Sequence, residues 1–134
     1  MSDINKKLDD VQRLFQQGDL DLALKKISKL VKNNKNNLLV HNYRGIVLVG
    51  LKKHREALLS FQKVVDLNPD FADAYSNMGM AYQQLSNFTH AIKSYKKAID
   101  INGDALHYRL NLASIYLEND KIHLAIHELS NLLE

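Results

Sequence analysis

Residues 75–98 read YSNMGMAYQQLSNFTHAIKSYKKA, and the spacing of their aromatic and small residues decides the fold. The marked positions are Tyr75, Met78-Gly79, Tyr82, Ala91, Tyr95 and Ala98. Related residues recur at a 34-residue spacing in both directions, with Gly45 and Ala113 at the position of Gly79. Self-similarity at a fixed period of this length predicts an array of helical hairpins. We number repeat positions from the four residues Ile4, Leu38, Ala72 and Leu106, so that Gly79 stands at repeat position 8.

This pattern resembles the tetratricopeptide repeat, whose consensus places an aromatic residue, Leu-Gly, Tyr, a small residue, an aromatic residue and a closing Pro at these spacings. The resemblance runs from Ile4 to the last residue with no insertion. It implies a single domain over residues 1–134, with repeats at approximately 4–37, 38–71, 72–105 and a truncated 106–134. The implied fold is all-α, a right-handed α-solenoid of four helix-turn-helix hairpins.

In the second, third and fourth repeats small residues stand at repeat positions 8 and 20, where two helices of a hairpin can approach closely. In the third repeat these residues are Gly79 and Ala91, which we expect to face each other. Short polar turns are expected at 17–19, 51–53, 85–87 and 118–120. We expect a left-handed residue to end a helix at Gly18, and Asn87 or Asn119 to take that conformation in later turns. Pro69 should follow a helix that ends near Leu67.

Composition excludes several classes of protein. There is no Cys, which leaves no disulfide framework, thiolate metal site or cysteine nucleophile. No stretch approaches 18 consecutive apolar residues, so no membrane span is predicted. The N-terminus lacks the apolar core of a signal peptide, and we expect a cytoplasmic location.

Histidine spacing gives little support for metal or catalytic chemistry. His123 and His127 are one helical turn apart, but the residue after the first is Leu124 rather than the Glu of a zinc protease helix. Repeat numbering places both His on the outward side of a second helix, where they are expected at the surface. With no phosphate-binding loop and no carboxylate pair, we predict no catalytic residue, no metal, no cofactor and no enzyme activity.

The net charge of +3 lies entirely in the first repeat. Residues 1–35 carry eight Lys or Arg against five Asp, whereas the remaining residues sum to zero. Lys25, Lys29 and Lys32 form a basic stripe at helical spacing. No aromatic residues interleave the stripe to stack bases, so binding of nucleic acid is disfavoured and a solvated outer face is preferred.

In proteins of this family the first helix of each repeat lines a concave groove. Carried onto this sequence, the first repeat presents Asn5, Leu8, Asp9, Gln12 and Gln16. The predicted peptide-binding groove residues of the later repeats are Asn42, Tyr43, Ile46, Asp73, Asn77, Met80, Gln84, His107, Asn111 and Ser114. Asn77 and Asn111 share repeat position 6, where an amide can pair with the backbone of an extended partner. Tyr43, Ile46 and Met80 add an apolar floor.

The chaperone-binding members of the family hold a C-terminal carboxylate with a clamp of Lys, Asn, Asn, Lys and Arg. Aligned on repeats one to three, the clamp positions here are Leu8, Gln12, Tyr43, Asp73 and Asn77. Aligned on repeats two to four they are Asn42, Ile46, Asn77, His107 and Asn111. Neither alignment supplies a cationic pair, and Asp73 would repel a carboxylate, so this partner is disfavoured.

The last helix, expected from about Lys121 to Leu133, carries apolar residues at helical spacing. Repeat arrays normally finish with a helix whose outer face is polar, and none follows here. Either the 134 residues are a piece of a longer protein, or this face pairs with another molecule. In the second case we expect a homodimer through the C-terminal helix, with an interface at Ile122, Ile126, Leu129 and Leu133.

The sequence thus favours a non-catalytic protein–protein interaction module that binds a protein or peptide ligand in its groove. Two alternatives stay open: an N-terminal substrate-presenting segment of a larger glycosyl- or sulfotransferase, and, with less support, a nucleic-acid-associated adaptor.

Overall fold

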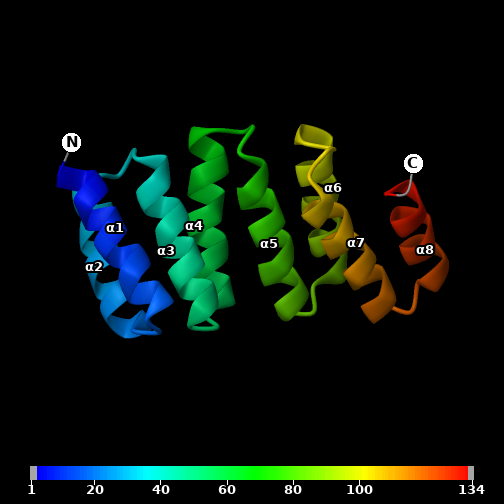
Figure 1. The fold of residues 1–134 in the computed structure, drawn as a ribbon, viewed down its shortest axis with the longest axis horizontal. Coiled ribbons are helices and arrows are strands. Elements are labelled where there is room, and N and C mark those ends of the chain that lie inside the picture. The colour runs from blue at the N-terminus through cyan, green and yellow to red at the C-terminus, as the bar shows by residue number, and fades with distance from the viewer. Residues whose placement is uncertain (1–2, 133–134) are drawn as a thin grey trace. The chain divides into compact units, whose positions relative to one another are not determined.

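The computed structural model describes residues 3–132 and contains eight α-helices in that range, with no strand (Figure 1). They are α1 (Asp3–Gln16), α2 (Leu20–Asn33), α3 (Leu38–Gly50), α4 (His54–Leu67), α5 (Ala72–Gln84), α6 (Phe88–Ile101), α7 (Leu106–Glu118) and α8 (Ile122–Asn131). The predicted all-α fold is confirmed. Within residues 3–132, no helix is both long and apolar enough to cross a membrane.

Helix boundaries repeat with the period read from the sequence. The second helices α2, α4, α6 and α8 begin at residues 20, 54, 88 and 122, each 34 residues after the last. The first helices α1, α3, α5 and α7 end at residues 16, 50, 84 and 118, with the same spacing. Helix α4 ends at Leu67, two residues before Pro69, as predicted. Helix α8 begins one residue later than expected, and Leu133, its predicted last residue, lies outside the described residues.

The chain divides into two compact halves, an N-terminal half (Met1–Asn68) and a C-terminal half (Pro69–Glu134). In the N-terminal half α1 packs on α2 and α3, α2 on α3, and α3 on α4. In the C-terminal half α5 packs on α6 and α7, α6 on α7, and α7 on α8. Adjacent first helices therefore touch within each half. A single domain over residues 1–134 remains a prediction.

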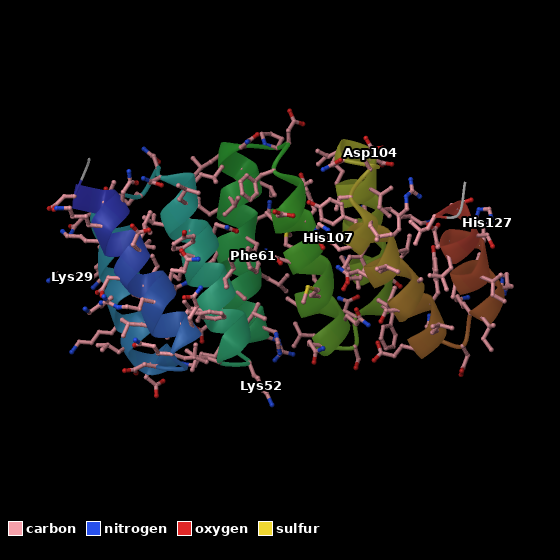
Figure 2. The ribbon with its side chains drawn as sticks, in the orientation of Figure 1. Lys29, Lys52, Phe61, Asp104, His107 and His127 are labelled. Atoms are coloured by element: carbon pink, nitrogen blue, oxygen red, sulfur yellow. The ribbon has the colours of Figure 1, made fainter. Side chains whose placement is uncertain are left out.

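The four hairpin turns share one backbone conformation, in which a left-handed residue ends the first helix. The left-handed residue is Gly18, Lys52, Ser86 or Asp120, always at repeat position 15, with φ of 80°, 62°, 58° and 56° (Lys52 is labelled in Figure 2). The next residue donates its N–H to the carbonyl five residues back, at Leu14, Leu48, Tyr82 and Tyr116, over 2.7–2.9 Å. This is the Schellman arrangement at a helix C-terminus, and it satisfies a carbonyl that the helix leaves unpaired.

The expectation of a left-handed Asn87 or Asn119 was wrong by one residue. Asn87 has φ −92° and precedes α6, where its side chain accepts a hydrogen bond from the His90 N–H; Asn119 has φ −98°. The left-handed position is set by where the first helix must stop for the second to pack against it. Ser86 and Asp120 therefore adopt this conformation at a cost of about 1–2 kcal/mol each.

Repeat position 20 holds Ala in all four repeats, and Ala23, Ala57, Ala91 and Ala125 are each 0% exposed. Repeat position 8 makes room for a ring. A Cβ atom on Gly79 would lie 2.6 Å from Cε1 of Tyr95, and one on Gly45 would lie 2.5 Å from Cε1 of Phe61. The atoms that approach Gly79 most closely thus belong to Tyr95, sixteen residues on, rather than to Ala91. The glycines let the aromatic rings lie directly on the first helix.

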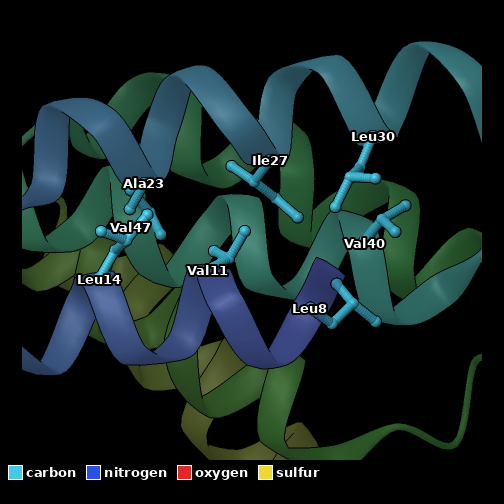
Figure 3. Packing of buried hydrophobic residues seen from close by; sticks show 8 residues of the cluster. All are labelled: Leu8, Val11, Leu14, Ala23, Ile27, Leu30, Val40 and Val47. Carbon is cyan, nitrogen blue, oxygen red and sulfur yellow. The ribbon is translucent and has the colours of Figure 1, made fainter. Parts of the chain in front are cut away.

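In the N-terminal half, three helices contribute to one buried cluster (Figure 3). Its members are Leu8, Val11 and Leu14 of α1, Ala23, Ile27 and Leu30 of α2, and Val40 and Val47 of α3. Spacings of three and four residues put each set on one helix face, which the other helices cover. The C-terminal half has a corresponding cluster in which Ala91 and Tyr95 of α6 meet Leu112, Ala113, Ile115 and Tyr116 of α7 and Ala125 of α8.

Candidate functional site

Three predicted groove residues lie on α3 in the N-terminal half. Tyr43 and Ile46 are half-buried, while Asn42 is buried with 9% of its surface exposed. The Asn42 Oδ1 atom has no hydrogen-bond partner among the described residues. Tyr43 and Ile46 line a cavity of about 240 Å³ between α3 and α1. The rest of its wall is formed by Val11, Gln12, Phe15 and Gln16 of α1 and Val47 of α3.

Phe15 was missing from the predicted concave set, although it stands at repeat position 12, one of the positions from which that set was drawn. Its ring rests against the last residue of α3: a Cβ atom on Gly50 would lie 3.0 Å from Cε2 of Phe15. The repeat numbering alone could therefore have identified Phe15.

Side chains of α5 and α7 are joined by a row of hydrogen bonds in the C-terminal half. The Tyr108 hydroxyl donates to Asp73 Oδ1, Asn111 Nδ2 donates to Ser76 Oγ over 3.2 Å, and Gln83 Nε2 donates to Glu118 Oε2 over 2.8 Å. The residues of each pair are 35 apart in the sequence, so each residue of α5 bonds a residue one repeat position further along α7. We call these three pairs the α5–α7 polar seam.

Two predicted groove residues already have partners in this seam. Asp73 accepts from Tyr108, and its Oδ1 lies 3.6 Å from Nε2 of His107 (labelled in Figure 2). Asn111 is half-buried and donates its amide N–H to Ser76, so its pairing with a ligand would compete with this internal hydrogen bond. Burial, together with the hydrogen bond to Asp73, raises the pKa of Tyr108 above its ordinary value, which keeps this hydroxyl a donor.

The remaining predicted groove residues are Asn77, Met80 and Gln84 on α5 and Ser114 on α7. Met80 is 42% exposed, Gln84 and Ser114 are exposed, and Asn77 is half-buried. The Asn77 amide has no hydrogen-bond partner within the described part of the chain, although it shares repeat position 6 with Asn111. These side chains are available to a ligand without loss of an internal hydrogen bond.

The basic stripe of α2 is solvated. Lys25, Lys29 and Lys32 are exposed, and Lys29 is labelled in Figure 2. The neighbouring Lys26 is committed to an ion pair, with its Nζ 2.6 Å from Asp10 Oδ2. That hydrogen bond from Lys26 holds the pKa of Asp10 below its usual range, and the charges of Lys26 and Arg13 act in the same direction against desolvation.

Each helix of the last hairpin exposes an apolar stripe. On α8, Ile122, Ile126 and Leu129 are 58%, 57% and 39% exposed. On α7, Leu106, Leu110 and Leu117 are 54%, 44% and 51% exposed. We call these six residues the α7–α8 apolar surface. Leu133, the fourth predicted interface residue, lies outside the described residues.

The preceding hairpin shows what such a surface normally contacts. At repeat position 5, Ser76 of α5 is 3% exposed and bonds Asn111 of α7, whereas Leu110 of α7 at that position is 44% exposed. At repeat position 24, Tyr95 is 1% exposed and Leu129 is 39% exposed. The face of α5 and α6 that packs against α7 therefore corresponds to the face of α7 and α8 that no described element covers.

The outward side of α8 carries His123 and His127, both exposed, with His127 labelled in Figure 2. Glu128 is half-buried, and its Oε2 lies 3.6 Å from Nη1 of Arg109. Among residues 3–132, no three His, Cys, Asp or Glu side chains are grouped in a way that could hold a metal ion.

Two family models match the chain. The model described as "Tetratricopeptide repeat" matches residues 72–104, and that described as "TPR repeat" matches residues 47–86. Together with four hairpins whose boundaries repeat every 34 residues, these matches over residues 47–104 support assignment of the chain to the tetratricopeptide-repeat family. Both models describe repeats, and no catalytic family is indicated. A total of four tetratricopeptide repeats remains a prediction.

Solved structures with the same fold include MamA, residues 41 to the end, from Desulfovibrio magneticus RS-1. It has a TM-score of 0.90 and 24% identity, and the match covers 98% of this chain and 74% of that chain. The first TPR of Spaghetti (RPAP3) bound to the HSP90 peptide SRMEEVD has a TM-score of 0.80 and 23% identity, over 85% of this chain and 90% of that one.

The second TPR domain of human RPAP3, in complex with the HSP70 peptide SGPTIEEVD, has a TM-score of 0.77 and 16% identity, over 81% of this chain and 91% of that one. At these identities the likeness establishes the fold, an all-α tetratricopeptide-repeat solenoid. No curated protein matched the sequence.

Proposed function

We propose that this protein is a non-catalytic interaction module that binds a partner polypeptide through its first helices, in a cytoplasmic setting. The observation that carries the proposal is the unpartnered Asn77 amide, which stands on α5 beside the exposed Met80. A side-chain amide can both donate to and accept from a peptide group, and Met adapts its shape to apolar ligands. Two structures of the same fold hold peptides, which supports this class of ligand.

The ligand we propose is an internal, extended segment rather than a C-terminal tail. The clamp positions carry no Lys or Arg in either alignment, and Asp73 is among them. A free carboxylate would therefore meet no cation that could form a charge-assisted hydrogen bond. The peptide SRMEEVD, which occupies the RPAP3 structure, is the probe for this point. Calorimetry should detect no binding below millimolar concentrations, and micromolar affinity would contradict the internal-segment proposal.

A photo-reactive residue at position 80 tests the proposal as a whole. We expect it to cross-link a discrete partner in cells, whereas the same residue at His127, on the outward side of α8, should not. A peptide from the cross-linked segment should then bind less tightly to Asn77→Ala by about 1 kcal/mol, because one hydrogen bond to the peptide is lost. The fold should be unaffected, since this amide has no internal partner. Equal cross-linking at both positions would contradict the proposal.

Asn111→Ala provides a matched comparison at the same repeat position. Because Asn111 donates to Ser76, its loss should lower both the affinity and the free energy of unfolding, each by about 1 kcal/mol. The double variant should weaken the peptide by about 1–3 kcal/mol in total. Wild-type affinity in the double variant would eliminate the two-Asn ladder.

We also propose that the α7–α8 apolar surface binds a second copy of the chain. Its six side chains are each about half exposed, so a partner could remove several hundred Å² of apolar surface from water per chain. At roughly 25 cal/mol per Å² this contributes several kcal/mol, against an association cost of about 4–15 kcal/mol. The area is below the roughly 800 Å² per partner of a standard interface, so a weak dimer is expected. Two-fold pairing closes on itself and leaves no free copy of the surface.

Sedimentation of Ile126→Glu tests the dimer. Ile126 is 57% exposed, so the charge remains solvated in a monomer and the fold should persist. Leu59→Glu, at the 72% exposed Leu59 of α4, introduces the same charge away from this surface and should leave the dimer intact. An unmodified chain that is monomeric at millimolar concentration would contradict the proposal.

A further inference from the structure

The side chains of α1 and α3 in the N-terminal half leave an open cavity between these two first helices. Its wall consists of the carbon surfaces of Phe15, Tyr43 and Ile46 over a floor of Val11 and Val47. Val11 and Val47 are 1% and 2% exposed and belong to the buried cluster in Figure 3, so the floor is rigid. No carboxylate, ammonium or guanidinium group lines it.

Comparison with the α5–α7 polar seam shows how the contact between adjacent first helices differs in the N-terminal half. In the seam, Gln83 at repeat position 12 donates to Glu118 at position 13 of the next first helix. The corresponding residues in the N-terminal half are Phe15 and Gly50. A ring replaces the amide and a hydrogen atom replaces the carboxylate-bearing side chain, with 3.0 Å between Phe15 Cε2 and the site of an added Cβ. Similarly, Leu8 and Tyr43 stand where Ser76 and Asn111 are hydrogen-bonded. These two pairs of positions are polar and hydrogen-bonded in the C-terminal half, and without polar side-chain groups except the Tyr43 hydroxyl in the N-terminal half.

The volume selects the size of the ligand. An apolar cavity of about 150 Å³ is sufficient to bind benzene. A cavity of about 240 Å³ therefore has room for one large side chain, such as that of Phe, Leu or Met, but not for a folded element. Its apolar wall would leave a charged group without a partner at a cost of several kcal/mol.

Two glutamines at the edge of the cavity select the form of the ligand. Gln12 and Gln16 are exposed, line the cavity and have no hydrogen-bond partner within residues 3–132. Four residues along a helix correspond to a rise of about 6 Å. Alternate peptide groups of an extended chain are about 6.6 Å apart. The two amides can thus pair with two alternate peptide groups of an extended segment, which flank two consecutive residues, and the side chain of one of these residues enters the cavity.

We propose that the α1–α3 cavity is the anchor site of the partner polypeptide, binding one large apolar side chain of an extended segment while Gln12 and Gln16 hold the flanking peptide groups. This inference rests on the proposed function, because it names the residue type that the concave surface selects. It adds Phe15 to the predicted concave residues of the first repeat, and it gives Gln12 and Gln16 of that set a specific role.

Small amides that resemble a single residue test the site without knowledge of the partner. We would titrate N-acetyl-phenylalaninamide and N-acetyl-leucinamide into the methyl-labelled full chain and follow it by NMR. The methyl signals of Val11, Ile46 and Val47 should shift and saturate at millimolar ligand, as expected for so few contacting atoms. N-acetyl-alaninamide and N-acetyl-lysinamide should require at least tenfold more ligand. Equal responses to all four amides, or no saturation, would overturn the proposal.

Two variants locate the binding. Gln12→Trp changes an exposed residue and should place an indole over the cavity, weakening the phenylalanine amide at least tenfold with the fold preserved. Ile46→Gln makes one wall polar and should weaken it similarly. Leu59→Gln, at the 72% exposed Leu59 of α4 and outside the cavity lining, introduces the same side chain as a control and should have no effect. Unchanged affinity in Gln12→Trp and Ile46→Gln would overturn the site.

The result is separable from the test of the proposed function. The amides carry no partner sequence, so failure of the titrations removes the anchor site and leaves cross-linking at position 80 to decide the concave surface. Failure of the cross-linking removes the proposed function even if the amides bind the cavity.

Discussion

Substituting Gly79 with Ala should show that Gly79, at repeat position 8, leaves room for the ring of Tyr95, at repeat position 24. The new methyl carbon would lie 2.6 Å and 2.7 Å from Cε1 and Cδ1 of Tyr95. Carbon atoms in contact are normally about 3.5–4.0 Å apart, so the ring must move by about 1 Å. It has little freedom to do so, because Tyr95 is 1% exposed and its hydroxyl donates to Gln83 Oε1 over 2.8 Å.

Two effects of opposite sign set the magnitude. Overpacking of this kind costs about 1–3 kcal/mol. Ala in place of Gly within a helix returns about 1 kcal/mol. The single variant Gly79→Ala should therefore lose about 0–2 kcal/mol of unfolding free energy. Because this range includes no change in stability, the single variant does not test the packing, and Tyr95 has to be varied as well.

The effect of Gly79→Ala is compared between the wild type and a Tyr95→Leu background, which lacks the aromatic ring. The fourth repeat pairs Ala113 with Leu129 at these two positions, so the chain already uses Ala with Leu where Gly stands with an aromatic ring elsewhere. In the Tyr95→Leu background the ring is gone, and Gly79→Ala should become stabilising by about 1 kcal/mol through helix propensity. The coupling energy should then be about 1–3 kcal/mol, within the range found for residues in contact.

Urea denaturation followed by far-UV circular dichroism measures all four proteins of the cycle. Tyr95→Phe is the control background, because it keeps the ring and must keep the penalty of Gly79→Ala. If Gly79→Ala has the same effect in the wild-type and Tyr95→Leu backgrounds within about 0.5 kcal/mol, the two residues are independent and the packing argument is refuted.

Three further outcomes are expected. Ala91→Leu should cost about 1–3 kcal/mol in urea denaturation, because Ala91 is 0% exposed and the added atoms have no space; unchanged stability would refute this packing. Ser86→Gly should raise the melting temperature through a gain of about 1 kcal/mol, because Ser86 has φ 58°, whereas Asn87→Gly should lower it by removing a helix cap. Burial raises the pKa of Tyr95 above its ordinary value of 10.0, so the stability that the protonated hydroxyl contributes is present below pH 10 and is lost as the pH rises further. Tyr95→Phe should therefore reduce the loss of unfolding free energy above about pH 10. An unchanged pH dependence in this variant would exclude Tyr95 as the source of that loss.

The 34-residue period and the architecture that follows from it could be read directly from the sequence. Helices α3, α5 and α7 begin at residues 38, 72 and 106, the predicted repeat boundaries. Ala at position 20 of every repeat is fully buried, as a small residue between close helices must be. These features are local, because they depend on helical periodicity and on side-chain size at fixed spacing, and both are visible in one chain.

Turn chemistry was only partly predictable. Gly18 signals a left-handed residue because glycine adopts positive φ without a steric penalty. Lys52, Ser86 and Asp120 occupy the same position with no such signal, and the general preference for Asn pointed one residue away, to Asn87 and Asn119. At these turns the register of helix packing overrides the conformational preference of the individual residue, at a cost of about 1–2 kcal/mol each.

Only the tertiary structure decided which side chains form hydrogen bonds and packing contacts with each other. Asn77 and Asn111 share repeat position 6, yet Asn111 donates to Ser76 across the α5–α7 polar seam while Asn77 remains unpartnered. In the N-terminal half, Phe15 likewise lies against Gly50, two residues 35 apart in the sequence. Contacts of this kind depend on the offset between adjacent first helices, which moves each partner one repeat position along. Repeat numbering lists the residues on a face, but hydrogen bonds and open volume depend on pairs, and the pairs are created only when the helices pack.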